Sequence, residues 1–287
     1  MNQLDAIPKL PNLPVPALLR QYGIRPDRRL GQNFLVEDAA LRKVVAAAEI
    51  SPADHILEIG PGLGSLTRYL AAVAGEVAAV ELDHRLLPAL KHVMVDFPRV
   101  RILQGDILEI NPVELMHAHP YSVVANIPYY ITSAVIRHLL TAAIQPMKFV
   151  LTLQQEVAER ICAAPGDMSL LALSVQVFGK PVITAHLPAG VFYPVPKVDS
   201  AVVRATMFPT PLVPTDHLDD FFRLAKAGFS QKRKTLRNAL AGGLRIKPVE
   251  AEGLLSAAEL DPRRRAETLS IAEWGQLTRI YTSRDAG

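Results

Sequence analysis

The chain has 287 residues, of which 49% are apolar and 21% are charged, and its formal net charge is +3. This composition predicts a globular protein with one major domain and a smaller one. No stretch reaches the roughly 18 uninterrupted apolar residues of a membrane span, and the first residues lack a secretory pattern. Cys162 is the only cysteine, which excludes an internal disulfide and gives no metal-ligand cluster. We therefore expect a cytoplasmic protein with no membrane and no metal partner.

Residues 1–28 are rich in proline and then amphipathic, which predicts a loose arm leading into one short helix. From His55 onward, short apolar runs alternate with segments of helix length. This alternation predicts a parallel sheet with helices on both faces, the architecture of a Rossmann-like α/β domain. The expected strands cover residues 55–59, 76–82, 100–103, 121–125 and 149–153, and the expected helices lie near 64–74, 84–95, 132–143 and 156–164.

Two further strand-like stretches, 182–187 and 200–208, predict a hairpin that completes one edge of the sheet. Prolines at positions 209, 211 and 214 then mark a linker. The chain beyond them has many Ala, Leu and Arg residues and few β-branched runs, which predicts a small helical domain. The expected division is an N-terminal arm at 1–28, a Rossmann-like domain at 29–208 and a helical domain at 209–287.

The segment from Asn126 to Tyr129, Asn-Ile-Pro-Tyr, follows an apolar run and is expected at a strand end. The Asn126 side-chain oxygen and the backbone carbonyl of Ile127 or Pro128 could accept the two N–H bonds of an exocyclic amine. That would turn the amine lone pair towards an electrophilic methyl group. Pro128 would stiffen the turn, and Tyr129 or Tyr130 could stack on a flat base. An ordinary turn between a strand and a helix is the alternative interpretation of this motif.

Glycines follow the first expected strand in the segment Glu58-Ile-Gly60-Pro-Gly62-Leu-Gly64. Glycine lets the backbone turn sharply and approach a ligand closely. The spacing departs from the Gly-x-Gly-x-x-Gly pattern of dinucleotide-binding folds. The acid before the loop would meet the amino group of an amino-acid-like ligand more readily than a pyrophosphate. A plain tight turn would also explain the glycines.

Acidic residues end the next two expected strands. Glu81 lies 21 residues after Gly60, where a carboxylate can accept hydrogen bonds from both ribose hydroxyls. Asp106 could accept a hydrogen bond from an adenine amine. Either acid alone could be a solvated strand end, but both lie with Asn126 at the carboxyl ends of parallel strands, where open α/β sheets bind ligands. The implied ligand contains an amino acid, a ribose and an adenine, as S-adenosylmethionine does.

Eight segments in order resemble the KsgA/RsmA type of rRNA adenine N6-dimethyltransferase along nearly the whole chain. They are residues 30–35 (Leu-Gly-Gln-Asn-Phe-Leu), 58–67, 80–83 (Val-Glu-Leu-Asp), 105–106, 126–129, 155–160, 192–200 and 229–238. The resemblance implies a class I S-adenosylmethionine-dependent methyltransferase fold and dimethylation of two adjacent adenosines. By this resemblance, the two adenosines would lie in the terminal hairpin near the 3′ end of small-subunit (16S) rRNA. The implied partner is this rRNA in a pre-ribosomal small subunit, bound by a monomer during ribosome biogenesis.

The resemblance also implies roles for individual residues. Asn126 and the Pro128 region would hold the target amine, while Tyr129 and Phe192 would sandwich the flipped base. A Phe between prolines could equally anchor the core. The residues implied in binding the cofactor are Gln32, Asn33, Leu35, Glu58, Gly60, Gly62, Glu81, Asp106, Ile107 and Asn126.

Basic residues are concentrated in the C-terminal part. Residues 221–249 contain eight lysines and arginines and no acid, and three arginines follow at 263–265. In a helix over residues 231–238, Arg233 and Arg237 would be neighbours on one face, where like charges repel and destabilise the helix. An anionic partner would turn this repulsion into a favourable interaction. A solvated basic face is the alternative to phosphate binding. The RNA-binding candidates are Lys232, Arg233, Lys234 and Arg237.

Three other functions remain open from the sequence. Erythromycin-resistance methyltransferases share the Gln-Asn-Phe-Leu and Asn-Ile-Pro-Tyr motifs but act on large-subunit rRNA. The segments 196–200 and 232–238 favour the small-subunit enzyme over them. A DNA adenine methyltransferase would use a similar Asn-Pro-Pro-Tyr motif. A nucleic-acid-binding or transcription-factor relative could keep the fold without the reaction, although the intact glycine loop and the strand-end acids argue against it.

Overall fold

The structure, a computed structural model, describes residues 7–128 and 131–285. The chain divides into two compact units: the first comprises the chain up to residue 158 and residues 182–206, and the second comprises 159–181 and the chain from 207. Residues 159–181 thus group with the C-terminal helices, whereas the sequence placed them in the Rossmann-like domain. One reason is that the backbone N–H groups of Gly166 and Met168 donate to the carbonyl of Glu267 at 2.9 and 3.1 Å.

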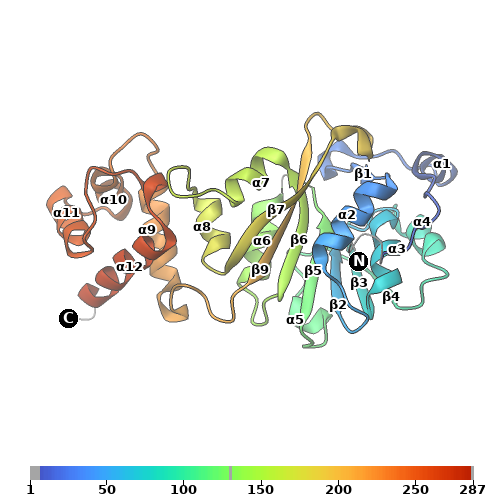
Figure 1. The fold of residues 1–287 in the computed structure, drawn as a ribbon, viewed down its shortest axis with the longest axis horizontal. Helices are drawn as coiled ribbons and strands as arrows, with labels where there is room; N and C mark the ends of the chain where they lie inside the picture. The colour runs from blue at the N-terminus through green and yellow to red at the C-terminus, as the bar shows by residue number, and fades with distance from the viewer. Residues whose placement is uncertain (1–6, 129–130, 286–287) are drawn as a thin grey trace. The chain divides into compact units, whose positions relative to one another are not determined.

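The main sheet has seven strands in the order β4-β3-β2-β5-β6-β9-β7 (Figure 1). Strands β4, β3, β2, β5 and β6 pair in parallel, and β9 runs antiparallel to β6. The five parallel strands predicted from apolar runs are present. β2, β3, β5 and β6 are buried along most of their length, as strands with helices on both faces are, whereas β4 at the sheet edge is only partly buried. Their bounds are β2 (His55–Ile59), β3 (Glu76–Glu81), β4 (Val100–Gln104), β5 (Tyr121–Asn126) and β6 (Lys148–Gln154).

The predicted hairpin lies at the sheet edge, with β7 (Gly179–Leu187) outermost and β9 (Ser200–Met207) beside β6. In the antiparallel register, Gln154 at the carboxyl end of β6 faces Ser200 at the start of β9. The connection 188–199 therefore lies at the edge where the parallel strands end. It contains β8 (Phe192–Tyr193), which pairs with β1 (Phe34–Leu35) in a separate two-stranded sheet.

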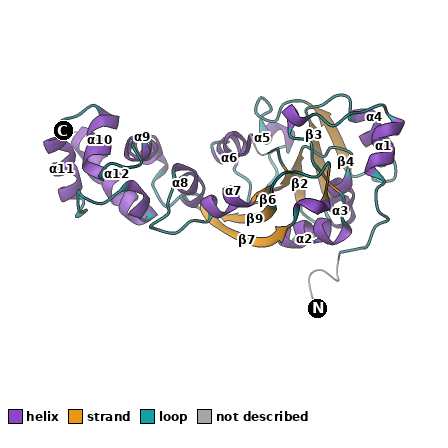
Figure 2. Ribbon diagram, turned by 90° about the horizontal axis from the view of Figure 1, so that it is seen from above, coloured by secondary structure: helices purple, strands orange, loops and turns teal. Residues whose placement is uncertain are grey.

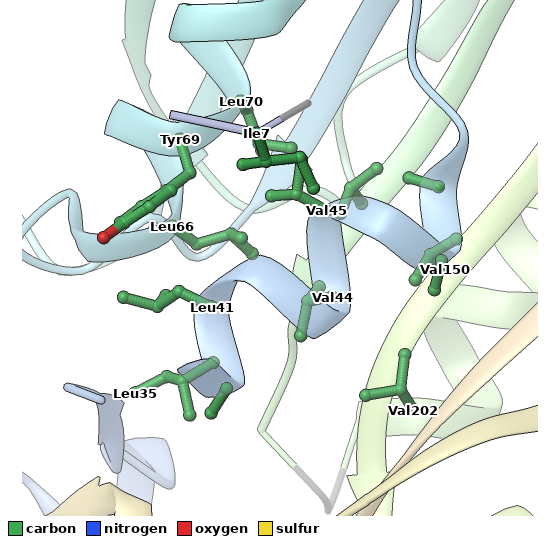
Figure 3. Packing of buried hydrophobic residues seen from close by; sticks show 14 of the residues in the cluster. Ile7, Leu35, Leu41, Val44, Val45, Leu66, Tyr69, Leu70, Val150 and Val202 are labelled. Atoms are coloured by element: carbon green, nitrogen blue, oxygen red, sulfur yellow. The ribbon is translucent and has the colours of Figure 1, made fainter. Parts of the chain in front are cut away.

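Helices cover both faces of the main sheet, with α2 and α3 on one side and α5 and α6 on the other (Figure 2). The core cluster of the first side contains Leu41 and Val44 of α2, Leu70 of α3, and strand residues such as Val150 (Figure 3). Helix α2, which the sequence analysis did not predict, is Ala-rich and buries one face. The bounds are α2 (Asp38–Ala48), α3 (Ser65–Val73), α4 (Leu87–Val93), α5 (Pro112–Leu115), α6 (Thr132–Leu140) and α7 (Gln155–Ile161).

The N-terminal segment packs on the first unit, whereas the sequence predicted a loose arm. Ile7 is buried in the core cluster (Figure 3), and the Pro11 carbonyl accepts a hydrogen bond from the Arg68 guanidinium at 2.9 Å. The predicted short helix is α1 (Val15–Gln21). Its apolar side joins a second cluster with Phe34 and Leu86, so the segment covers part of the fold.

The second unit is helical, as predicted. Trp274 is fully buried and stacks on Phe229 with ring centroids 5.8 Å apart. The helix considered over residues 231–238 begins only at Leu236, and the residues before it form a turn. The backbone N–H of Leu236 donates to the carbonyl of Arg264 at 2.7 Å. The helices are α8 (Leu170–Gln176), α9 (Leu218–Phe229), α10 (Leu236–Leu244), α11 (Pro248–Ala257) and α12 (Ile271–Asp285). Within the described residues, none of the helices has the length and apolar character needed to cross a membrane.

Candidate cofactor and substrate site

A solvent-open pocket lies at the carboxyl ends of β2, β3, β4 and β5. Its walls are the glycine loop after β2, the ends of β3 and β4, the segment after β5 and residues 30–34 from the N-terminal part. Residues far apart in the sequence meet here because the ends of parallel strands share one edge. Nine of the predicted site residues line it: Gln32, Asn33, Gly60, Gly62, Glu81, Asp106, Ile107, Asn126 and Pro128.

The glycine loop leaves room for a ligand on one side and packs tightly on the other. At Gly60, with φ +69°, a Cβ atom would meet nothing within 4 Å. At Gly62, with φ +62°, a Cβ atom would lie 2.9 Å from the Phe34 ring. Both the positive φ and the nearby Phe34 ring therefore disfavour a side chain at Gly62. The loop is thus a tight turn and also lines the pocket.

Glu81 is fixed by backbone donors at the end of β3. Its Oε2 accepts a hydrogen bond from the Gly62 N–H at 2.9 Å, and its Oε1 accepts from the Asp83 N–H at 2.8 Å. The residue is 5% exposed. Burial raises the pKa of the Glu81 carboxyl group, and the two backbone hydrogen bonds oppose this rise. Each carboxylate oxygen retains acceptor capacity, so a pair of ribose hydroxyls could bind to a group already held in place.

Asp106 and Ile107 form the wall beyond β4. The Oδ1 atom of Asp106 accepts a hydrogen bond from the Leu108 N–H at 2.9 Å, and the Asp106 carbonyl accepts from Glu109 and Ile110. Ile107 is 4% exposed and lines the pocket. The wall thus combines a carboxylate acceptor with an apolar side chain, which suits the amine edge and the flat face of an adenine.

Glu58 does not line the pocket, although the sequence placed it beside the ligand. Neighbouring strand residues point to opposite sides, and Ile59 takes the pocket side. The Glu58 carboxyl group is buried, with the Thr67 hydroxyl as its neighbour, and its Oε2 has no hydrogen-bond partner within the described residues. Burial raises the pKa of Glu58 to about 8, the Thr67 hydroxyl lowers it, and the charge of Glu81 adds to the rise.

Gln32 binds neighbouring protein groups with both ends of its amide. Its Oε1 accepts from the Asp27 N–H at 2.7 Å, and its Nε2 donates to Asp83 Oδ2 at 2.7 Å. Asp83 also accepts two hydrogen bonds from the Arg85 guanidinium at 2.8 and 2.6 Å. Arg85 and then Gln32 hold the pKa of Asp83 at about 2 against the effect of burial. Asp83, which was not among the predicted site residues, therefore anchors the wall 30–34; the matching run 80–83 was the available signal.

Asn126 joins that wall to the end of β5. Its Nδ2 donates to the backbone carbonyl of Asn33 at 3.0 Å, so its Oδ1 is the atom suited to accept from a substrate amine. Pro128 lines the pocket, and its carbonyl also accepts from the Ile131 N–H at 3.2 Å. Ile127 is 2% exposed and does not line the pocket, so of the two carbonyls considered, that of Pro128 is better placed. Tyr129 and Tyr130 lie outside the described residues.

Leu35 and Phe192 lie in the core cluster and do not line the pocket. They face each other in the pairing of β1 with β8, and each is 2% exposed. Figure 3 shows Leu35 beside Leu41 of α2. Both residues are therefore part of the core that underlies the small sheet. In this structure Phe192 anchors the core, which was the alternative interpretation of this residue. A stacking role for Phe192 would require one face of its ring to become exposed.

Among the RNA-binding candidates, Lys232, Arg233 and Lys234 are exposed in the turn that precedes α10. Arg237 instead forms an ion pair with Glu252 at 3.1 Å. The later arginines are also paired, Arg263 with Asp261, Arg264 with Glu273 and Arg265 with Glu267. Of the predicted candidates, those at 232–234 are therefore the cations best placed to meet an anionic partner. Within the described residues, no three or more His, Cys, Asp or Glu side chains form a group that could hold a metal ion.

The fold and the pocket together define a Rossmann-like methyltransferase. The structure is similar to the crystal structure of a dimethyladenosine transferase from Plasmodium falciparum, with a TM-score of 0.75 and 24% identity over 88% of this chain and 98% of that chain. It is also similar to that of the 23S rRNA methyltransferase ErmE, with a TM-score of 0.69 and 27% identity over 86% of this chain and 99% of that chain. These likenesses confirm the predicted fold class.

The chain belongs to the ribosomal RNA adenine dimethylase family, whose model matches residues 25–278. It is 46% identical to ribosomal RNA small subunit methyltransferase A of Dehalococcoides mccartyi (strain CBDB1), over 92% of this chain and 91% of that protein. It is 41% identical to the protein of the same name from Moorella thermoacetica (strain ATCC 39073 / JCM 9320), over 92% of this chain and 95% of that protein. The family resemblance predicted from eight segments is thereby confirmed.

Glu58 should make the stability of the first unit depend on pH. Its pKa is about 8 in the folded protein against an ordinary value of 4.5, so the folded state binds a proton that the unfolded state has released. The free energy of unfolding should therefore fall as the pH rises from about 4.5 to about 8. Glu58→Gln should flatten this decline in urea titrations at several pH values. The control is Glu109→Gln, which removes an exposed carboxyl group; equal pH slopes in wild type and Glu58→Gln would contradict the assignment.

Asp83→Ala should weaken cofactor binding although Asp83 does not line the pocket. Gln32 and Arg85 would lose their shared acceptor, and the wall 30–34 would be less firmly held. Because hydrogen bonds to charged groups contribute about 1.5–3 kcal/mol, we expect the dissociation constant for S-adenosylmethionine to rise about tenfold in calorimetry. Asp96→Ala, an exposed substitution in the same unit, should leave the constant unchanged. If Asp83→Ala also binds normally, the wall does not depend on this network.

Proposed function

We propose that this protein is an S-adenosylmethionine-dependent rRNA adenine N6-dimethyltransferase. It would modify two adjacent adenosines in the terminal hairpin near the 3′ end of small-subunit rRNA. The observation that carries the proposal is that Asn126 and Pro128 share one pocket with Glu81 and Asp106. Membership of the ribosomal RNA adenine dimethylase family and 46% identity to a small-subunit methyltransferase support it.

The pocket residues fit the three parts of S-adenosylmethionine. The Glu81 carboxylate would accept from the ribose hydroxyls, and Asp106 would accept from the adenine amine while Ile107 packs on the ring. The open side of the backbone at Gly60 would accommodate the amino-acid part next to Asn33. When bound, the cofactor supplies a methyl group on a positively charged sulfur, which makes its methyl carbon electrophilic.

Asn126 and Pro128 would orient the target amine for an in-line displacement. The Asn126 Oδ1 atom would accept one N–H bond and the Pro128 carbonyl the other, which turns the nitrogen lone pair towards the methyl carbon. The amine nitrogen would form its bond to the methyl carbon as the C–S bond breaks, and the electron pair of that bond would remain on sulfur. The amine becomes acidic only as the C–N bond forms, so its proton can leave to water without a strong base. Acceleration would come from orientation and preorganised dipoles.

The RNA must present an unstacked adenosine to this pocket, at a cost of a few kcal/mol. Tyr129 remains a candidate for stacking on the flipped base. Phe192 would contribute only after leaving its buried position, so its predicted role now depends on a local rearrangement. The exposed cations Lys232, Arg233 and Lys234 would contact phosphates and read the shape of the RNA. We propose a monomer that acts in the cytoplasm on a pre-ribosomal small subunit.

Large-subunit rRNA is the second candidate substrate, because the fold also resembles the 23S rRNA methyltransferase ErmE. Identity to that protein is 27%, compared with 41–46% to the small-subunit methyltransferases. Incubation of undermethylated small subunits, large subunits and DNA with tritiated cofactor, followed by nucleotide mapping, separates these substrates. The proposal requires label on two adjacent adenosines of the small-subunit rRNA; label elsewhere, or no transfer, would refute it.

Asn126→Ala should reduce turnover far more than cofactor binding. The substitution removes one of the two acceptors for the amine, and loss of one preorganised hydrogen-bonding group typically costs about 10²- to 10³-fold in kcat. Single-turnover methylation of small subunits measures the rate, and calorimetry measures cofactor affinity. The control is Asn12→Ala, which changes an exposed asparagine. Unchanged turnover in Asn126→Ala would remove this residue from the proposed mechanism.

Replacing Lys232, Arg233 and Lys234 by alanine should weaken RNA binding and flatten its salt dependence. For every phosphate that the variant no longer neutralises, the slope of log affinity against log salt concentration should fall by about one. The matched control replaces Lys9, Arg20 and Lys91, which are exposed cations of the first unit, and changes the net charge equally. Binding of small subunits at several salt concentrations provides the test. An identical slope for the wild type and the 232–234 variant would show that these cations contact no phosphate and are simply solvated.

A further inference from the structure

Tyr193 is an exposed aromatic residue beside a buried one. It is 39% exposed, whereas Phe192 is 2% exposed, because consecutive strand residues point to opposite sides. Within the described part of the chain, the Tyr193 side chain forms no hydrogen bond, ion pair or ring contact. The methyl-transfer mechanism does not use it. Its ring is therefore available to a partner.

The pairing of β8 with β1 places Tyr193 on the pocket side of this small sheet. Tyr193 faces Phe34, and Phe192 faces Leu35. Residues directly opposite each other in an antiparallel pair lie on the same face. Leu35 and Phe192 share the core cluster, whereas Phe34 lines the pocket. Tyr193 therefore lies next to the wall 30–34, which is bonded through the Asn33 carbonyl to Asn126.

The connection that carries Tyr193 is anchored at both ends. The Val36 N–H donates to the Val191 carbonyl at 3.0 Å, and the Ala189 N–H donates to Asp199 Oδ1 at 2.8 Å. The Gln155 N–H donates to the Asp199 carbonyl at 3.1 Å, which ties the connection to the carboxyl end of β6. Since tyrosine has few rotatable bonds, the Tyr193 side chain would lose little conformational entropy when a partner stacks on it.

The residues after Tyr193 add apolar and positive surface. Val195 is 63% exposed and Val198 is 46% exposed, and the side chain of Lys197 is also exposed between them. An exposed aromatic ring near a cation is the combination that binds unpaired nucleotides, since the ring stacks on a base and the cation meets a phosphate. Lys197 gives this surface a charge complementary to RNA.

We propose that Tyr193 stacks on an unpaired base next to the target adenosine and that Lys197 contacts the adjoining phosphate. The inference rests on the proposed function and extends it to a second nucleotide. Tyr193 is a positioning residue here, because it holds the RNA strand and touches neither the cofactor nor the reacting amine. The surface then extends the pocket along the RNA strand, with the target base inside and its neighbour held at the rim.

Steady-state methylation of undermethylated small subunits tests the stacking contact. Base stacking on an aromatic side chain contributes enough for Tyr193→Ala to raise the KM for the particle about 5- to 150-fold. Tyr193→Phe should stay within about twofold of wild type because it keeps the ring. Tyr193→Leu keeps an apolar side chain and should resemble Tyr193→Ala, which guards against a folding defect. The dissociation constant for S-adenosylmethionine should be unchanged in all three variants.

The base that stacks is identified with small subunits reconstituted from rRNA that carries an abasic residue at one position flanking the target pair. At the stacked position, the abasic residue should raise the KM of wild type but not that of Tyr193→Ala. An unchanged KM in Tyr193→Ala would overturn the inference. So would a Tyr193→Ala effect on KM that is equally large with the unmodified particle and with every abasic particle, because Tyr193 would then contact something other than a flanking base, such as ribosomal protein. Failure of wild type to methylate the unmodified particle would instead refute the proposed function.

Discussion

The parallel pairing of β2 with β3 on one side and β5 on the other is the constraint on which the site depends. It brings the carboxyl ends of these strands to one edge, so Gly60, Glu81 and Asn126 meet although the chain between them is long. β4 adds Asp106 at the same edge. Because neighbouring parallel strands with buried faces tolerate little slippage, the register of the sheet sets the spacing between the residues that we propose for the cofactor and Asn126, which we propose for the target amine.

Residues 30–34 of the N-terminal segment form the wall that completes the pocket at the strand ends. Phe34 packs against Gly62, the Asn33 carbonyl accepts from Asn126, and Gln32 donates to Asp83. These three contacts connect one wall to the glycine loop, to the end of β5 and to the turn after β3. The wall therefore contacts both the glycine loop, which we propose for the cofactor, and Asn126, which we propose for the substrate. A shift of the wall would therefore move both the glycine loop and Asn126, which gives a physical basis for coupling cofactor binding to the position of Asn126.

Ion pairing decides which basic residues remain available to an anionic partner. Arg264 donates to Glu273 at 2.5 Å and to the Thr268 carbonyl at 2.6 Å, so it holds segments of the helical unit together. Arg237 is paired with Glu252. The exposed turn before α10 keeps Lys232 and its two neighbours accessible to phosphates. A run of basic residues in the sequence thus contains both structural and partner-facing cations, and tertiary contacts separate them.

The sequence by itself determined the strands of the main sheet, because most of them are runs rich in apolar residues, and it located Glu81, Asp106 and Asn126 because these polar residues lie where such runs end. Helix α2, the packing of residues 7–28 and the grouping of 159–181 with the C-terminal helices were decided by tertiary contacts. So was the direction of individual side chains: Glu58 and Phe192 are buried, whereas Ile59 lines the pocket and Tyr193 is exposed. A pattern of residue types does not say which alternating face meets the ligand, since that depends on pairing between distant segments such as β1 and β8.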